Sequence, residues 1–267
     1  MMSIFFKAKK KSENFENHLI DYLNSKNIYS NPIELLLPET VELLNIEGDW
    51  KGILSNKSRK ERVYRTIQLW EEYITEFSII IDVFKKKLIS IDSILYQKEI
   101  HVVYTLKDYD GVSAKSGNPA NTSIVYSTQH IEKSANESLY KLDFETRGVL
   151  YHELVHAYQF EPKGIGSYST NKTFWACIEG LADAVRAQAG YFDMSTRKPG
   201  GNWMDGYRTT GFFIQWLTTK DPDAIRKFHE TVRDLDEWSF DKAIKRMFGE
   251  DASIEGLWNE YQAFLSK

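Results

Sequence analysis

Cysteine is almost absent from this chain, which has 267 residues and a single cysteine, Cys177. One thiol cannot form an internal disulfide, and it cannot build a thiolate metal site alone. No run of about 18 apolar residues occurs, so we expect no transmembrane helix. The N-terminal MMSIFFKAKKK also lacks the apolar core of a signal peptide. We therefore expect a cytoplasmic protein, or a secreted one if a leader has been removed.

An excess of positive charge is lacking too. The chain has 34 lysines and arginines against 38 aspartates and glutamates, which gives a net charge of −4 at pH 7. Because binding to phosphates requires a positive surface, we expect no nucleic-acid partner. Hydrophobic residues make up 42% of the chain and charged residues 27%, which is typical of a globular protein with a sizeable core. Composition leaves the oligomeric state open.

The N-terminal part of the chain is predicted to be largely helical. A helix is predicted over residues 12–25, and proline and glycine punctuate an irregular stretch over 26–58. Apolar residues then recur at three- and four-residue spacing from 58 to 90, which predicts one or two amphipathic helices. We expect residues 1–95 to form an N-terminal helical segment that belongs to the same fold as the rest.

The pattern changes after this segment. Two short β-branched stretches, 101–106 and 122–127, predict neighbouring strands of a small sheet, separated by the glycine-, asparagine- and proline-rich stretch 110–121. Beyond these strands the periodicity is helical almost to the end. Helices are predicted over 143–160, 172–190, 205–219, 222–235, 239–248 and 254–265. Helices and strands are therefore segregated along the chain, which indicates the α+β class.

The strongest chemical signal is the pentapeptide His152-Glu153-Leu154-Val155-His156. Residues four apart lie on one face of a helix, so the two imidazoles can converge on one ion. In this HExxH arrangement zinc accepts both imidazole nitrogens, and the glutamate is the general base beside the metal-bound water. We predict His152 and His156 as ligands of one Zn²⁺ per chain and Glu153 as the catalytic base. The alternative is a helix with two histidines in ordinary hydrogen bonds.

A second signal, EGLAD at residues 179–183, lies on the next predicted helix. A catalytic zinc requires a third protein ligand and one open position, and Glu179 has the right chemistry for that ligand. Asp183 lies one turn further on the same face, where its carboxylate would accept the free N–H of a ligand histidine. HExxH followed by ExxxD is the gluzincin pattern of zincins. Alternatively, the two carboxylates would form an exposed acidic face or pair with Arg186.

Hydrolysis of an amide also requires a donor that stabilises the developing oxyanion. Tyr207 follows a glycine-rich stretch and opens a predicted helix, and a neutral phenol can donate. We predict a catalytic role for Tyr207, with core packing as the alternative in a chain of 15 tyrosines. Gln159, three residues after His156, either supports that histidine or is an ordinary helical residue. The strand over 122–127 is a candidate sheet edge for an extended peptide substrate.

Three stretches of the chain, GVLYHELVHAYQF, IEGLADAVRAQAGY and NWMDGYRTTGFFIQWL, resemble the basic secretory protein family of zinc peptidases, best known from plants. The family's HExxHxxQ, EGxADxVR and GYxxTxxFxxW/Y motifs occur here in order. The likeness covers about residues 99–266. It implies a zincin-like fold and peptidase activity, with His152, His156 and Glu179 as the ligands. This chain differs from the family in being acidic and in having no evident secretion signal.

These observations predict a zincin-like metallopeptidase fold of the α+β class, in which N-terminal helices and a small sheet precede a mainly helical C-terminal half. Residues 96–267 are expected to form the catalytic region. The expected function is zinc-dependent hydrolysis by metal-activated water, most simply of a peptide or protein substrate. Two alternatives stay open: a catalytically silent binding protein with the zincin fold, and a zinc hydrolase of a non-peptide amide or ester.

Overall fold

The computed structural model describes residues 6–7, 35–36, 43–47, 101–107, 109–118 and 121–267. The chain divides into two compact units: the first holds the described residues up to Val149, and the second holds Leu150–Lys267. The helices predicted over 12–25 and 58–90 lie outside the described residues. The proposed division into segments 1–95 and 96–267 stays a prediction.

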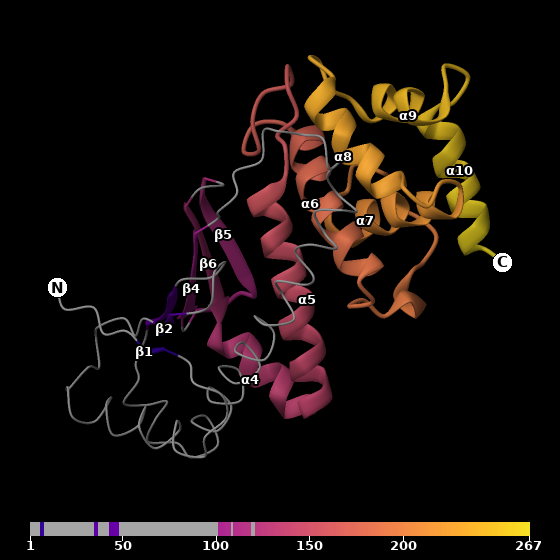
Figure 1. Cartoon of the computed structure of the whole chain (residues 1–267). Helices are drawn as coiled ribbons and strands as arrows, with labels where there is room; N and C mark the ends of the chain where they lie inside the picture. Colours follow the sequence, from indigo (N-terminus) through magenta and orange to yellow (C-terminus); the bar gives the residue numbers. More distant parts are fainter. Residues whose placement is uncertain (1–5, 8–34, 37–42, 48–100, 108, 119–120) are drawn as a thin grey trace. The chain divides into compact units, whose positions relative to one another are not determined.

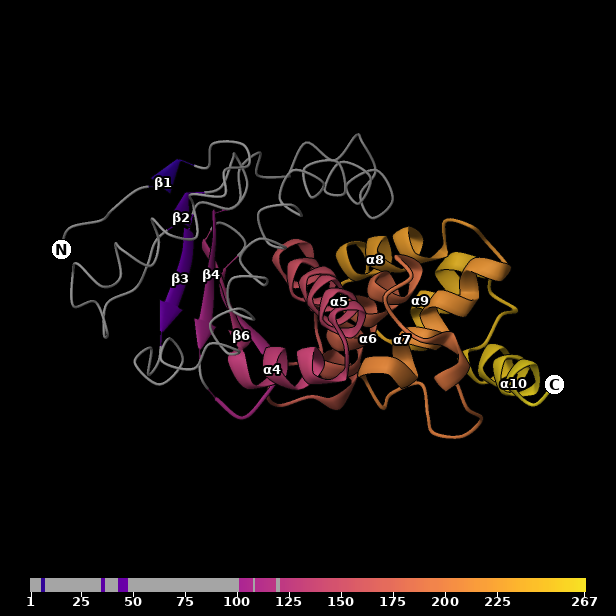
Figure 2. The same ribbon diagram turned by 90° about the horizontal axis from the view of Figure 1, so that it is seen from below.

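The first unit contains a mixed sheet whose strands follow the order β1-β2-β3-β4-β6-β5. Its strands are β1 (Phe6–Lys7), β2 (Leu35–Leu36), β3 (Leu43–Glu47), β4 (His101–Lys107), β5 (Ser113–Asn118) and β6 (Asn121–Ser127). Strands β3, β4 and β6 run parallel, and Figure 2 shows them next to one another. At the two sides, β2 pairs antiparallel with β3, and β5 pairs antiparallel with β6.

Two of these strands confirm the sequence prediction. Strand β4 pairs with β6 over its whole length, from His101 opposite Asn121 to Lys107 opposite Ser127. Alternate residues of β6 are buried, as a strand with one face on a core requires. The expectation that 26–58 is irregular is wrong for β2 and β3, and the linker predicted over 110–121 contains β5.

The hypothesis that β6 is a sheet edge is also wrong. β6 lies between β4 and β5 and makes ladder hydrogen bonds on both sides. A strand with two neighbours has no free backbone groups to pair with a substrate. An extended peptide therefore cannot add to the sheet at β6.

The chain turns from β6 directly into helix at Ser127. The Ser127 hydroxyl accepts the backbone N–H of His130 and caps α4 (Thr128–Glu137), a helix that the sequence did not predict. Helix α5 (Leu139–Tyr158) follows, and Thr146 on α5 shares a buried hydrogen bond of 3.3 Å with the Tyr126 hydroxyl of β6. The N-terminal part of α5, up to Val149, belongs to the first unit, and its last turns belong to the second.

The rest of the second unit is mainly helical, and its predicted helices are confirmed. They are α6 (Lys172–Gln188), α7 (Tyr207–Trp216), α8 (Ala224–Asp234), α9 (Phe240–Phe248) and α10 (Ile254–Leu265), with short 3₁₀ turns at Met194–Thr196 and Leu217–Thr219. Figure 1 shows α7 beside α6, with α8, α9 and α10 further along the chain. None of the helices in the described part of the chain combines the length and apolarity of a membrane span. The chain is thus mixed α/β, with a mainly helical C-terminal half.

Helix α6 is the core helix of the second unit. Every residue from 176 to 187 is buried, including Glu179 and Asp183. A helix that is buried on all sides must meet neighbours on all sides. Beyond α6, aromatic rings form the core, with Phe213 of α7 packed against Trp258 and Tyr261 of α10. The two carboxylates of EGLAD therefore lie inside the unit and do not form an exposed acidic face.

Helices α6 and α7 approach closely at Gly180. A methyl group added there would lie 2.3 Å from Thr210 Cγ2 and 2.7 Å from Thr210 Cβ. Thr210 cannot turn away cheaply, because its Oγ1 accepts the N–H of Gly206 at 2.8 Å and donates to the carbonyl of Trp203 at 2.7 Å. Gly180 is therefore required by the spacing of the two helices.

We expect Gly180→Ala to lower the free energy of unfolding by about 1–3 kcal/mol, the usual cost of overpacking a core. The loss should appear even though alanine gains about 1 kcal/mol over glycine in helix propensity. Denaturant unfolding measures the change. Gly256→Ala in α10 is the matched control, since that glycine is exposed and a methyl group there meets only Ser253 Oγ, at 3.0 Å. Equal stability changes in the two variants would contradict the packing argument.

Candidate metal centre

Helix α5 places His152 and His156 on the same face, one turn apart. Their imidazole rings are perpendicular, with centroids 4.7 Å apart and the two Nε2 atoms 3.1 Å apart. Leu154 and Val155, between them in sequence, are buried in the core. The helical period thus turns the apolar residues inward and directs both imidazoles toward one point.

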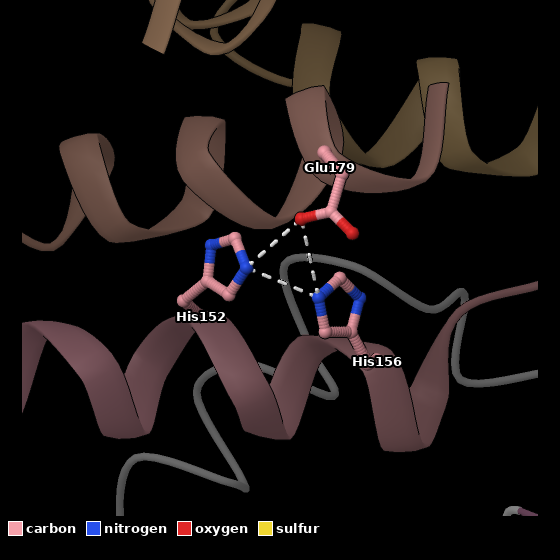
Figure 3. Close-up of side chains that lie close together, drawn as sticks. All are labelled: His152, His156 and Glu179. Carbon is pink, nitrogen blue, oxygen red and sulfur yellow. Dashed lines mark hydrogen bonds and ion pairs between the residues drawn. The ribbon is translucent and has the colours of Figure 1, made fainter. Parts of the chain in front are cut away.

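Glu179 reaches the same point from α6. Its Oε2 lies 3.1 Å from His152 Nε2 and 3.7 Å from His156 Nε2. Figure 3 shows the three side chains converging from the two helices. One donor atom from each residue lies within 4.8 Å of the other two, so the group could hold a metal ion. All three residues belong to the second unit, so the centre lies within one compact part of the chain.

The outer nitrogen of each imidazole is held by a side-chain oxygen. His152 Nδ1 donates to Asp183 Oδ1 at 2.7 Å, and His156 Nδ1 donates to Gln159 Oε1 at 2.8 Å. The Gln159 amide nitrogen in turn donates to the carbonyl of Ile178 at 2.7 Å, which fixes the direction of the amide. In the neutral form of each ring, a proton on Nδ1 leaves the Nε2 lone pair for the shared point. Gln159 thus contacts a histidine of the centre and is more than an ordinary helical residue.

The donor set fits a small cation. When both rings are neutral, two Nε2 lone pairs and a carboxylate oxygen face one another, and a proton on Nε2 or a metal ion relieves their repulsion. Four ligands at about 2.0–2.1 Å around tetrahedral zinc are about 3.3–3.4 Å apart. The three separations here are 3.1, 3.1 and 3.7 Å. Two nitrogens and one oxygen also leave a fourth position open.

The electrostatics of the centre favour positive charge. Burial lowers the pKa of His152, but hydrogen bonds with Asp183 and Glu179 and the nearby carboxylate charges outweigh it and raise the pKa from 6.5 to about 10. Burial raises the pKa of Glu179, but the hydrogen bond from His152 and the charges of both histidines lower it below 4.5 overall. Glu179 is therefore a carboxylate, and the surrounding negative charge stabilises a cation at this point.

Glu153 lies beside the centre but outside the donor group. It is 5% exposed, and its charge contributes to the raised pKa values of His152 and Tyr207. A buried carboxylate near the histidines but outside the donor group has the chemistry of a proton acceptor.

Tyr207 faces the centre from the first residue of α7. Its ring stacks on His152 with centroids 6.0 Å apart and packs edge-on against Trp175 at 5.6 Å. Its φ of 39° is the one positive value among the non-glycine residues of the described part of the chain. Gly206 before it has φ 71°, and a methyl group there would lie 2.4 Å from the Trp175 ring. Strained backbone of this kind is concentrated at functional sites.

Core packing does not account for Tyr207, because the side chain is 48% exposed. Burial of its hydroxyl raises the pKa of Tyr207, and the charge of Glu179 adds to this effect. The residue is thus a neutral phenol at physiological pH, able to donate a hydrogen bond.

Sequence reasoning missed one residue at the centre. Tyr168, in the loop between α5 and α6, donates its hydroxyl to Glu179 Oε1 at 2.5 Å. Arg186, the alternative partner proposed for the two carboxylates, donates from Nε to the carbonyl of Tyr191 and lies 4.2 Å from the Phe192 ring centroid.

Two histidines and a glutamate around one point, with a buried carboxylate and a phenol beside them, define a candidate hydrolytic metal centre. The chain belongs to the family described as "Peptidase of plants and bacteria" (BSP), whose model matches residues 65–261. This match covers more than half of the chain and agrees with the resemblance to the basic secretory protein family. Comparisons with curated proteins and with solved structures found no match.

Proposed function

We propose that this protein is a zinc-dependent peptidase of the zincin type, with His152, His156 and Glu179 as the ligands of one Zn²⁺. The observation that carries the proposal is the convergence of two Nε2 atoms and one carboxylate oxygen, with both Nδ1 atoms turned outward. Membership in a peptidase family supports amide hydrolysis as the reaction class. HExxH on one helix and a glutamate on the next correspond to the gluzincin type.

Zinc suits the donor set better than the other common divalent ions. Imidazole nitrogens suit zinc, copper, iron and nickel, whereas magnesium and calcium prefer six or more oxygens. Two histidines and one glutamate with an open fourth position are a known ligand set of catalytic zinc. A centre of this kind is expected to hold one zinc per chain.

A bound zinc would lower the pKa of a water molecule and polarise a substrate carbonyl. Glu153 would accept the proton of the attacking water and later deliver it to the leaving amine. Tyr207 donates its hydroxyl to the oxyanion as it develops. Asp183 and Gln159 keep both imidazoles in the tautomer whose Nε2 lone pair faces the centre.

The proposed substrate is a peptide or a protein, in keeping with the family. The same zinc chemistry would serve a non-peptide amide or an ester, and a silent binding protein would retain the ligands without turnover. The cytoplasmic location predicted from the sequence stays a prediction.

Metal analysis combined with a cleavage assay tests the proposal. We expect the purified protein to contain about one zinc per chain and to cleave a peptide library, with the new ends identified by mass spectrometry. Model esters and small amides, assayed in parallel, measure the activity on other substrates. Zinc without cleavage of any substrate would indicate a silent binding protein. Failure to take up zinc from a zinc-containing buffer would refute the metal centre itself.

A further inference from the structure

Tyr168 controls the oxygen of Glu179 that does not face the histidines. Its hydroxyl donates to Oε1 at 2.5 Å, whereas Oε2 is the oxygen that lies 3.1 Å from His152 Nε2. Oε1 therefore accepts a hydrogen bond from Tyr168 in the loop, and Oε2 faces the two histidines of the centre. Without Tyr168, rotation of the carboxylate would exchange them.

The loop that carries Tyr168 is held in place at both ends. At its start, the carbonyl of Lys163 accepts the backbone N–H of Trp238 at 3.0 Å. At its end, the carbonyl of Ser167 accepts the N–H groups of Thr170 and Asn171, and the Asn171 side chain caps α6. Tyr168 lies within this hydrogen-bonded turn, so its hydroxyl is presented to Glu179 by a defined backbone.

A packing role does not explain this arrangement. The Tyr168 side chain is 45% exposed, whereas the rings of the neighbouring core are buried. A ring that is half exposed while its hydroxyl donates to a buried carboxylate indicates that the hydroxyl is the functional part.

We propose that Tyr168 is a positioning residue of the metal centre, which fixes the Glu179 carboxylate with Oε2 toward the ion. This inference rests on the proposed function, because it assigns a role within the same centre. Removing a partner that orients a metal ligand in this way typically lowers metal affinity or activity by about 10–100-fold.

Tyr168→Phe in the full chain tests the proposal, since it removes one oxygen and keeps the ring. We expect the dissociation constant for Zn²⁺, measured by competition with a chelating dye, to rise by about 10-fold or more. At saturating zinc we expect kcat on a library-derived peptide to fall by about 10-fold, with KM changed little. The visible absorption of the Co²⁺-substituted variant should differ from that of the wild type, because the carboxylate is no longer fixed.

Tyr140→Phe is the matched control, since Tyr140 is 75% exposed and stacks only on Phe144 among the described residues. The melting temperature of the zinc-free protein separates positioning from folding. A weaker zinc affinity with an unchanged zinc-free melting temperature supports the proposal. An unchanged affinity, or a loss matched by lower zinc-free stability, overturns it. If Tyr168→Phe behaves as the wild type and Glu153→Gln is inactive, this inference alone is rejected. If Glu153→Gln is fully active, the proposed function is rejected.

Discussion

Replacing Glu153 by glutamine is expected to abolish peptide hydrolysis while the bound metal stays in place. Glutamine has nearly the same shape as glutamate, but its amide cannot accept the proton of the attacking water. General-base catalysis typically contributes 10²–10⁴-fold, so kcat should fall by about that factor. The side chain is only 5% exposed, so bulk water cannot readily replace it as the base.

The metal content of the variant separates catalysis from assembly. Glu153 is not one of the three residues whose donor atoms converge. Elemental analysis of Glu153→Gln should therefore give the same number of zinc ions per chain as the wild type. Melting curves should coincide within a few degrees, since a neutral amide is no harder to bury than a carboxylate. Full activity in the variant would mean that another group is the base. Loss of the metal would mean that Glu153 supports the ligands instead.

The helical half of the fold was predictable because its signals are local. Apolar periodicity and the breaks at proline and glycine gave helices whose boundaries agree with α5 to α10 within a few residues. Helix α4 was missed because its buried stripe is narrow: only Thr128, Ile131 and Ser134 are buried, and only one of these is apolar. The Ser127 cap was the one signal available.

The missed strands depend on pairing with distant residues. Strand β5 has the sequence SAKSGN, and Ala114, Ser116 and Gly117 are exposed, so no apolar face marks it. It is a strand because its backbone pairs with β6, and the residue pattern alone does not encode that partner. Strand β3 has only five residues between proline- and glycine-containing stretches, which is too short for an alternation to be recognised.

The centre shows the same division between local and distant signals. His152 and His156 are one turn apart on one helix, so sequence spacing alone places them together. Predicting Glu179 as their partner required a second motif, on the next helix. The contact of Tyr168 with Glu179 joins a loop to a helix, and a single tyrosine in a serine-rich loop carries no periodicity that would predict it. Its position between the two ligand helices was the only hint.

Close packing connects the two helices that carry the centre. Gly180, next to Glu179, lets α7 approach α6, and Thr210 of α7 then fixes the N–H of Gly206. Because Gly206 has no side chain, the Trp175 ring can pack against its backbone. Gly206 directly precedes Tyr207, whose backbone is strained. The position of the proposed oxyanion donor thus depends on a glycine beside a proposed ligand, which suggests that Gly180→Ala lowers kcat as well as stability.

Removal of zinc should abolish activity and lower the melting temperature without unfolding the protein. The ion would join α5 to α6 through three side chains, and a ligand that binds only the folded state stabilises it by about 2.7–4.1 kcal/mol at 100–1,000 times its dissociation constant. At about 2–4 °C per kcal/mol for a chain of this size, the expected fall is about 5–15 °C. The zinc-free protein should remain folded because α6 is buried among apolar neighbours.

A chelator titration followed by return of zinc measures both effects. Activity and melting temperature should recover together as about one zinc per chain is restored, because one centre is responsible for both. Glu179→Gln provides the comparison: a neutral amide in place of the 3.1 Å carboxylate contact should weaken zinc binding, so added zinc should raise its melting temperature much less. A chelated protein that retains full activity, or a Glu179→Gln variant stabilised by zinc as strongly as the wild type, would show that the ion does not bind between these two helices.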